Sequence, residues 1–510
     1  MVRRVYCLLL FAGLLNLVVG QTVKKSFPVK RDESPETWRS DGEAAVARAK
    51  NTRFKKGKAK NVILFIGDGM GISTLTASRI LEGQLRGESG EENQLSFERF
   101  PFTALSKTYT VNQQTSDSAP TMTAIMTGLK TDEDVLSVDQ NVVFNDYKTV
   151  KGNEALTLLE IAEKSGKSTG VVSTARLTHA TPAACYAHSP NRDWESDADI
   201  LASAKDAYEA KYPDIARQLI EFPYGDGVEV ALGGGRKKFI PKDVNDPEYP
   251  DKKGERLDNR NLAEEWTKRY KDSEFVWNKE QFDTIDSSKT NHLLGLFEPS
   301  DMQHEYDRAH AGKIAEPSLS EMTSKAIDVL SKNKKGYFLM VEGGRIDHAH
   351  HDGNAFRALT DTIELSNAVR TAQNKVDLKD TLIIVTADHS HTFVMSGYPA
   401  RGNNILGLVR GVDRKGEISD KPSLDKNKKP YTTLGYANGS GARKGTRPDL
   451  TDEQTTDPDF IQEALIPLGS ETHGGEDVAI FANGINSYLI HGVMEQNWIF
   501  YVMKDAMRLK

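Results

Sequence analysis

Four short runs along the chain are continuously apolar and predict the central strands of the fold. They cover residues 61–69, 168–175, 336–344 and 381–389. A strand with one wet face alternates apolar and polar residues, whereas a strand buried on both faces does not. We therefore expect an α/β fold, with a central, mostly parallel sheet covered by helices.

The segments between these runs differ in character. Residues 33–51 predict an amphipathic helix that begins at Ser34-Pro35, because Pro is well tolerated in the first turn. Residues 195–331 are polar and rich in turns. Residues 394–467 are rich in Gly, Pro, Lys and Asp, and we expect them to form an irregular insertion over the sheet edge.

The first twenty residues predict a cleaved secretory signal. Arg3 and Arg4 precede an apolar run that is too short to span a membrane, and small residues precede Gln21. The last residues contain only a short apolar run and end basic, so we expect neither a transmembrane helix nor an anchor signal there. The expected location is extracellular.

Composition and charge limit the function classes. Hydrophobic residues make up 38% and charged residues 27% of the chain, as in a soluble globular protein, and the net charge of -7 argues against nucleic-acid binding. The basic stretch FKKGKAK, residues 54–60, is local and predicts a solvated loop before a strand. Without the signal, Cys185 is the remaining cysteine, so we expect a buried thiol and no disulfide.

Acidic residues and a histidine follow the predicted strands. Asp68, Glu342, and the pair Asp388-His389 come at the ends of three of the apolar runs. Ligands of open α/β sheets bind outside the carboxyl ends of the strands, so these side chains are expected to converge on one spot.

Further residues fit a metal site. Asp347 lies four positions before His351, so on a helix both would share a face, but His350 is three positions away and could compete. His473 adds another imidazole and Thr181 a hydroxyl. Imidazole with carboxylate suits zinc, whereas carboxylate, hydroxyl and water suit magnesium.

Ser118 in TSDSAPTMTAIMTG has two possible roles. A serine before a helix is most often a cap, but beside a metal its hydroxyl becomes a nucleophile. Two metals about 4 Å apart suit an in-line phosphoryl displacement. A forked arginine would hold the phosphate oxygens, and Arg192 and Arg176 are both candidates that spacing does not separate.

These residues stand in recognisable motifs: VILFIGDGMG, DSAPT, HATPAACYAHSPNRDW, YFLMVEGGRIDHAHHD, VTADHSH and ETHGGEDV. In this order they resemble the alkaline phosphatase family over almost all of residues 21–510. The segments DPEYPD, RLD, LFEPSDM and GYPARG resemble its animal branch. The resemblance implies a single domain with a three-layer sandwich and a crown-like insertion at about 394–467.

The resemblance also implies residue roles and favours His351 over His350 and Arg192 over Arg176. It implies two zinc ions and one magnesium ion per subunit, with His179 near the magnesium. The implied residues are Ser118 as nucleophile and Arg192 as phosphate clamp; Asp347, His351 and His473 for the first zinc; Asp68, Ser118, Asp388 and His389 for the second; and Asp68, Thr181 and Glu342 for magnesium.

The animal branch carries a calcium site, which the resemblance places within residues 195–331. Its implied ligands are Glu248, the carbonyl of Phe297, Glu298 and Glu316. Glu316 stands where the family usually has an aspartate, and its longer arm still suits the flexible calcium shell.

The expected function is hydrolysis of small phosphate monoesters, with an alkaline optimum and a phosphoserine intermediate. A homodimer is implied by the resemblance, with Tyr398 at the subunit contact. A sulfatase would need an arginine where Met122 stands. A phosphodiesterase would use a different nucleophile turn, and a structural calcium- or mineral-binding protein would need neither Ser118 nor Arg192.

Overall fold

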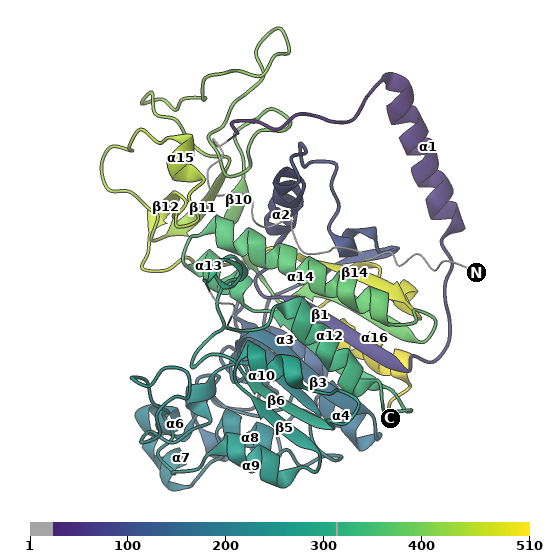
Figure 1. Ribbon diagram of the computed structural model, residues 1–510, viewed down its shortest axis with the longest axis vertical. Helices are drawn as coiled ribbons and strands as arrows, with labels where there is room; N and C mark the ends of the chain where they lie inside the picture. The colour runs from purple at the N-terminus through teal and green to yellow at the C-terminus, as the bar shows by residue number, and fades with distance from the viewer. Residues whose placement is uncertain (1–23, 313–314) are drawn as a thin grey trace, which may run out of the picture.

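A ten-stranded sheet forms the centre of the computed structural model, which describes residues 24–312 and 315–510 (Figure 1). Within the described residues its order is β15-β2-β14-β8-β1-β7-β3-β4-β6-β5, and β14 alone runs antiparallel to its neighbours. The strands are β1 Asn61–Gly67, β2 Phe102–Lys107, β3 Ser168–Arg176, β4 Val230–Gly234, β5 Ser273–Val276, β6 His292–Leu296, β7 Tyr337–Gly343, β8 Thr381–Ala387, β14 Val478–Gly484 and β15 Gly492–Glu495. The predicted signal lies outside the described residues.

The four apolar runs form β1, β3, β7 and β8, which are neighbours and parallel, as predicted. Their apolar side chains are buried because they face helices on both sides. In β1, Val62, Leu64 and Ile66 belong to one core cluster, while Ile63 and Phe65 belong to the other.

Helices cover both faces of the sheet, which confirms the predicted three-layer α/β architecture (Figure 1). The first core cluster is shared with α3 Ser118–Thr127, α4 Leu158–Lys164, α5 Ala180–Ala183, α8 Ile215–Ile220, α9 Leu262–Arg269 and α16 Trp498–Met507. The second is shared with α2 Ile72–Leu85, η1 Ser96–Arg99, α10 Lys279–Thr284, α12 Leu319–Leu330 and α14 Ala355–Lys375.

The polar middle segment is more regular than its sequence suggests, because β4, β5 and β6 lie in it and extend the main sheet. These strands have only four or five residues each, which gives too short an apolar run to detect. The remaining elements of the segment are α6 Asp197–Ser203, α7 Lys205–Glu209, η3 Arg236–Lys238 and α11 Glu305–His310.

The late segment also contains regular structure, although it was expected to be irregular. Strands β10 Phe393–Met395, β11 Leu434–Gly439 and β12 Ala464–Pro467 form a three-stranded sheet, and α15 Asp452–Thr455 follows β11. Phe393 and Tyr436 pack into a core cluster with Leu81 of α2 and Leu359 of α14. The segment therefore rests on these two helices.

The helix predicted after Ser34 is present as α1, Pro35–Asn51, and Ser34 caps it. None of its residues is buried, and Figure 1 shows that it stands away from the rest of the structure. In the part of the chain that the structure describes, no helix is both long and apolar enough to cross a membrane. The other short helices are α13 Arg345–His351, η2 Tyr147–Thr149 and η4 Ser487–Leu489.

Candidate metal centre

The register of the central strands brings the predicted acids together at one edge of the sheet. Gly67 of β1 pairs with Ala387 of β8, so Asp68 and Asp388 leave neighbouring strands side by side. Glu342 of β7 pairs with β1 and also with Ser173 of β3. Asp68, Glu342 and Asp388 are fully buried. The expected convergence at the carboxyl edge is therefore present.

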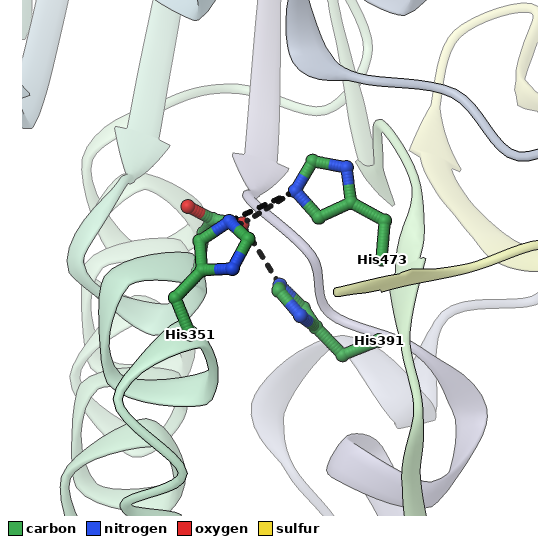
Figure 2. A group of neighbouring side chains, drawn as sticks. His351, His391 and His473 are labelled. Carbon is green, nitrogen blue, oxygen red and sulfur yellow. Dashed lines mark hydrogen bonds and ion pairs between the residues drawn. The ribbon is translucent and has the colours of Figure 1, made fainter. Parts of the chain in front are cut away.

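A first donor set lies where α13 meets a short two-stranded ladder, β9 Ser390–His391 with β13 His473–Gly474 (Figure 2). The Oδ1 atom of Asp347 lies 3.4 Å from Nε2 of His351, 3.3 Å from Nε2 of His473 and 2.8 Å from Nε2 of His391. The ligating atoms of all four residues lie within 4.8 Å of one another, which fits one metal ion.

Hydrogen bonds on the far side of two rings orient them for this role. Nδ1 of His351 lies 2.6 Å from the carbonyl oxygen of Glu471, and Nδ1 of His473 lies 2.7 Å from that of Ser116. A carbonyl oxygen accepts a hydrogen bond from the N–H at Nδ1, which leaves the lone pair of the neutral ring on Nε2. The two Nε2 atoms lie only 3.0 Å apart, an arrangement that suits a shared cation.

His391 is a residue that the sequence reasoning missed, although it stands two positions after His389 in VTADHSH. Its Nδ1 lies 2.6 Å from Oε2 of Glu471, and its Nε2 contacts Asp347. Burial alone would lower the pKa of His391, but the hydrogen bonds to these two carboxylates outweigh it and raise the pKa to about 9. The ring thus acts as a charged bridge that positions Asp347.

A second donor set surrounds the Ser118 hydroxyl. Its Oγ lies 3.1 Å from Nε2 of His389 and 3.4 Å from Oδ1 of Asp68. Nε2 of His389 is 3.3 Å from Asp68 and 3.4 Å from Oδ2 of Asp388. Oδ1 of Asp388 accepts from the backbone amides of Gly69 and His389, whereas its buried Oδ2 has no hydrogen-bond partner among the described residues.

Ser118 is the first residue of α3, and the cap of this helix is Asp117, whose side chain accepts from the Ala119 amide. Of the two roles that the sequence leaves open for Ser118, the capping role therefore belongs to Asp117 instead. Because Asp117 takes the capping role, the hydroxyl of Ser118 is free to face the donor set at the sheet edge.

A third set contains Asp68, Glu342 and His179, whose ligating atoms lie within 4.8 Å of one another. Thr181 donates from Oγ1 to Oδ2 of Asp68 at 3.2 Å, so Asp68 faces both this set and the second. Glu342 accepts from Ser173 through Oε2, while its Oε1 and Nδ1 of His179 are buried and have no hydrogen-bond partner within residues 24–312 and 315–510.

The two candidate arginines differ in their contacts. Arg176 is held by Glu195 at 2.9 Å and Asp301 at 2.8 Å. Arg192 donates to Oδ2 of Asp117 at 2.6 Å, and its Nη2 lies 3.1 Å from Nε2 of His179. Arg192 is thus beside the residue that precedes Ser118.

The buried carboxylates at this edge of the sheet need cations to compensate their negative charge. Burial, followed by the charges of neighbouring acids, raises the pKa of Asp68 and Asp388. Burial also raises the pKa of Glu342, to about 8. Buried carboxylates with unpartnered oxygens are costly unless a cation compensates them, so the donor sets fit bound metal ions.

The predicted calcium ligands lie in one region but are less tightly grouped. Glu248 accepts from Arg236 at 3.0 Å, Glu298 from the Tyr249 hydroxyl at 2.9 Å, and Glu316 from the Gln303 amide at 2.8 Å. Burial and the charge of Glu298 raise the pKa of Glu316 to about 8, and its buried Oε2 has no hydrogen-bond partner in the part of the chain that the structure describes. Across residues 24–312 and 315–510, the groups with ligating atoms within 4.8 Å do not include these three glutamates. Phe297 is fully buried beside Glu298.

Two remaining candidates lie apart from these sets. His350 lies 3.0 Å from the Thr74 hydroxyl and 2.8 Å from that of Tyr436, so both its ring nitrogens are occupied. Cys185 is buried, as expected, and burial raises its pKa.

The sequence profile described as alkaline phosphatase matches residues 59–509. The chain is 44% identical over 489 residues to the alkaline phosphatase of Gadus morhua, covering 94% of this chain and 98% of that relative. The chain belongs to the alkaline phosphatase family. It is 43% identical over 502 residues to the tissue-nonspecific isozyme of alkaline phosphatase from Homo sapiens, covering 96% and 92% of the two chains.

Solved structures of alkaline phosphatases share the fold. The Thermus thermophilus structure aligns with a TM-score of 0.62 at 22% sequence identity and covers 91% of this chain and 94% of its own. The alkaline phosphatase of the Antarctic bacterium TAB5 aligns with a TM-score of 0.59 at 22% identity, over 90% and 100%. Membership of the family supports an enzyme that hydrolyses phosphate monoesters and uses a metal centre.

Proposed function

We propose that this chain hydrolyses small phosphate monoesters by double displacement, with phosphoserine on Ser118 as the intermediate. The observation that carries the proposal is the position of the Ser118 hydroxyl at the start of α3, in contact with His389 and Asp68 and close to Arg192. A merely structural metal cluster would need neither a free hydroxyl nor an arginine at this place.

The donor sets are assigned by ligand chemistry. Two imidazoles with a carboxylate suit zinc, and carboxylates with a hydroxyl suit magnesium. We assign Asp347, His351 and His473 to one zinc ion; Asp68, Ser118, Asp388 and His389 to a second; and Asp68, Thr181 and Glu342 to magnesium, with His179 beside it. When bound, these ions would supply positive charge that favours the Ser118 alkoxide and neutralises phosphate and leaving oxygen.

The residues of the chain then perform the following steps. Oγ of Ser118 loses its proton to solvent and attacks phosphorus; an Oγ–P bond forms, the bond from phosphorus to the ester oxygen breaks, and that oxygen takes a proton from solvent and leaves as the alcohol. Arg192 would turn from Asp117 to hold two phosphate oxygens with its planar fork. Water on the side of phosphorus opposite to Oγ then loses a proton and attacks phosphorus, the P–Oγ bond breaks, Oγ takes up a proton, and phosphate leaves. Loss of protons from Oγ and from water favours an alkaline optimum.

A calcium ion in the middle segment belongs to the same proposal, held by Glu248, Glu298, Glu316 and the carbonyl of Phe297. Its support is the unpartnered buried oxygen of Glu316 and the raised pKa of these glutamates. Glu298 and Glu316 are near enough for their charges to interact, and carboxylate oxygens gathered in this way suit an oxygen-liganded ion such as calcium.

Secretion, a homodimer and a single domain of residues 21–510 complete the proposal. The pattern of the first twenty residues supports secretion. A 17-residue helix α1 without a buried residue and a 96% exposed Tyr398 support a subunit contact, with the late segment as the crown-like insertion. The net charge of -7 does not favour nucleic acid as a substrate or partner.

The test combines trapping of the intermediate with metal removal. Wild-type protein and Ser118→Ala are incubated with labelled phosphate or a chromogenic monoester, quenched in acid and digested. We expect label on the peptide that contains Ser118, loss of turnover on chelation, and recovery when zinc and magnesium are both returned. Full turnover by metal-loaded Ser118→Ala would rule out the covalent route.

A further inference from the structure

A hollow of about 1050 Å³ opens at the edge of the sheet opposite to the metal centre. Lys60, Lys167 and Lys335 lie at or just before the starts of the adjacent strands β1, β3 and β7. Helices α4 and α16 supply its other walls. Seven residues of β1 separate the two edges, which at about 3.3 Å per residue is about 20 Å.

The lining of this hollow is strongly basic. None of its lining residues is acidic, and none of its basic side chains lies within 4.0 Å of a carboxylate in the described chain. Such a concentration is unexpected in a protein with a net charge of -7. The basic residues are Lys58, Lys60, Lys164, Lys167, Lys334, Lys335, Lys504, Arg508 and Lys510.

Lys167 is a buried lysine in the lining of the hollow. It is 4% exposed, and its Nζ donates to the carbonyl oxygens of Lys60 at 2.7 Å and Lys335 at 2.6 Å. Burial, followed by the charges of Lys58 and Lys60, lowers its pKa to about 8. Like charges that are held together without acids favour an anion between them.

The basic stretch FKKGKAK, residues 54–60, contributes lysines to the hollow. It is an irregular loop before β1, as the sequence predicts, and its Lys58 and Lys60 line the hollow. Segments far apart in the sequence supply the other cations, so the charge belongs to a folded site and not to one flexible tail.

The apolar residues of the lining limit the classes of anion that could bind in the hollow. Leu129, Leu156 and Tyr501 are exposed there, whereas Phe500 is buried. Single-stranded nucleic acid needs successive aromatic platforms for its bases, and the hollow exposes one aromatic ring. A flat anionic membrane does not enter a concave site. An oligosaccharide fits a hollow that is too large for a single inorganic anion.

We propose that this hollow binds a sulfated oligosaccharide, with the basic residues pairing with its sulfate groups. Sulfate is preferred to phosphate because the proposed activity would remove phosphate monoesters from a bound chain, whereas sulfate esters would persist. The site lies on the opposite edge from the metal centre, so binding of an anionic oligosaccharide there does not depend on the hydrolytic mechanism, whereas the choice of sulfate over phosphate rests on the proposed function.

The test is direct binding of a fluorescent heparin-derived hexasaccharide to the full-length, metal-loaded protein, measured by polarisation at about 0.1 M salt, where the screening length is about 10 Å. We expect saturable binding that weakens as salt rises. Inorganic sulfate at the same total sulfate concentration should compete poorly, because it cannot bridge several lysines.

A double variant and a matched control locate the binding site. Lys164→Glu with Lys335→Glu reverses two exposed charges at the hollow, and Lys415→Glu with Lys444→Glu makes the same change in charge on the late segment. We expect about tenfold or greater weakening in the first variant and little change in the second, since contacts with a polyanion depend on local charge. Monoester turnover, which reports folding, should remain in both.

A second measurement uses the unaltered protein. Brief acetylation of lysines, followed by mass spectrometry, should show protection of Lys164 and Lys335 by the hexasaccharide and none of Lys415 or Lys444. Equal weakening in both double variants, or no protection at the hollow, would overturn the proposal. Tighter capture by phosphatidylserine vesicles or by a single-stranded oligonucleotide of equal charge, through the same lysines, would overturn the carbohydrate assignment.

Discussion

Replacement of His391 by Gln tests the charged bridge in the metal centre. The ring joins two buried carboxylates, Asp347 and Glu471, and its pKa is raised from 6.5 to about 9. Since each pKa unit is worth about 1.4 kcal/mol, the charged ring contributes about 3 kcal/mol to the free energy of unfolding of the metal-free protein. Gln is neutral and removes this contribution.

The sign of the pH dependence follows from the raised pKa. The contribution is complete below the unfolded pKa of about 6.5 and is lost as pH rises through about 9. Urea unfolding of chelated wild-type protein and His391→Gln, at about pH 6 and about pH 10, should therefore show a difference of about 3 kcal/mol that shrinks toward zero.

His350→Gln is the matched control, because His350 is equally buried but bonds to the Thr74 and Tyr436 hydroxyls. Burial lowers its pKa, so the ring stays neutral and its replacement should have the same effect at both pH values. If His391→Gln differed from wild type equally at both pH values, the ring would not be a charged bridge. With metals present, the variant should bind zinc about 10–100-fold more weakly, as is usual when a group that orients a ligand is lost.

Three further predictions concern other parts of the molecule. Arg192→Lys should weaken inhibition by inorganic phosphate about tenfold or more while zinc content is unchanged, because a point charge cannot make the forked contact; unchanged inhibition would contradict the clamp. Glu316→Gln should remove any rise in melting temperature on addition of calcium, read by thermal unfolding of chelated protein, and a calcium response equal to wild type would exclude Glu316 as a ligand. Removal of the chain up to residue 51, which deletes α1, should shift the protein from dimer to monomer in analytical ultracentrifugation, and an unchanged dimer would exclude this helix from the contact.

The sequence predicts the centre of the sheet well, because β1, β3, β7 and β8 are buried on both faces and their apolar runs are unbroken. It does not reveal β4, β5 and β6, since these strands have only four or five residues, with glycines in β4 and β6 and two polar residues in β5, and so resemble ordinary loops. The antiparallel direction of β14 is also not visible, because a buried strand has the same apolar pattern in either direction.

The metal centre is likewise predictable from the sequence only in part. The acids at strand ends are predictable, since parallel strands deliver them to one edge. The pairing of β9 with β13 is not, because it joins His391 to His473 across the whole late segment. Without knowledge of that ladder, the spacing of the histidines does not show whether His391 binds a metal ion or instead bridges two carboxylates. Asp117 and Ser118 are adjacent, and both are residue types that commonly cap helices. The sequence therefore does not show which of them is the cap, and the backbone conformation assigns this role to Asp117.

The same β9–β13 ladder allows the late segment to change in length and sequence without moving the donor set. It ties the segment's two ends together through His391 with His473 and Ser390 with Gly474, directly beside the donor set. Once the ends are fixed, doubling the length of a closed loop costs only about 0.6 kcal/mol in chain entropy. Insertions, deletions and substitutions in the segment can therefore change the surface that it offers to a partner, while the donor atoms keep their positions.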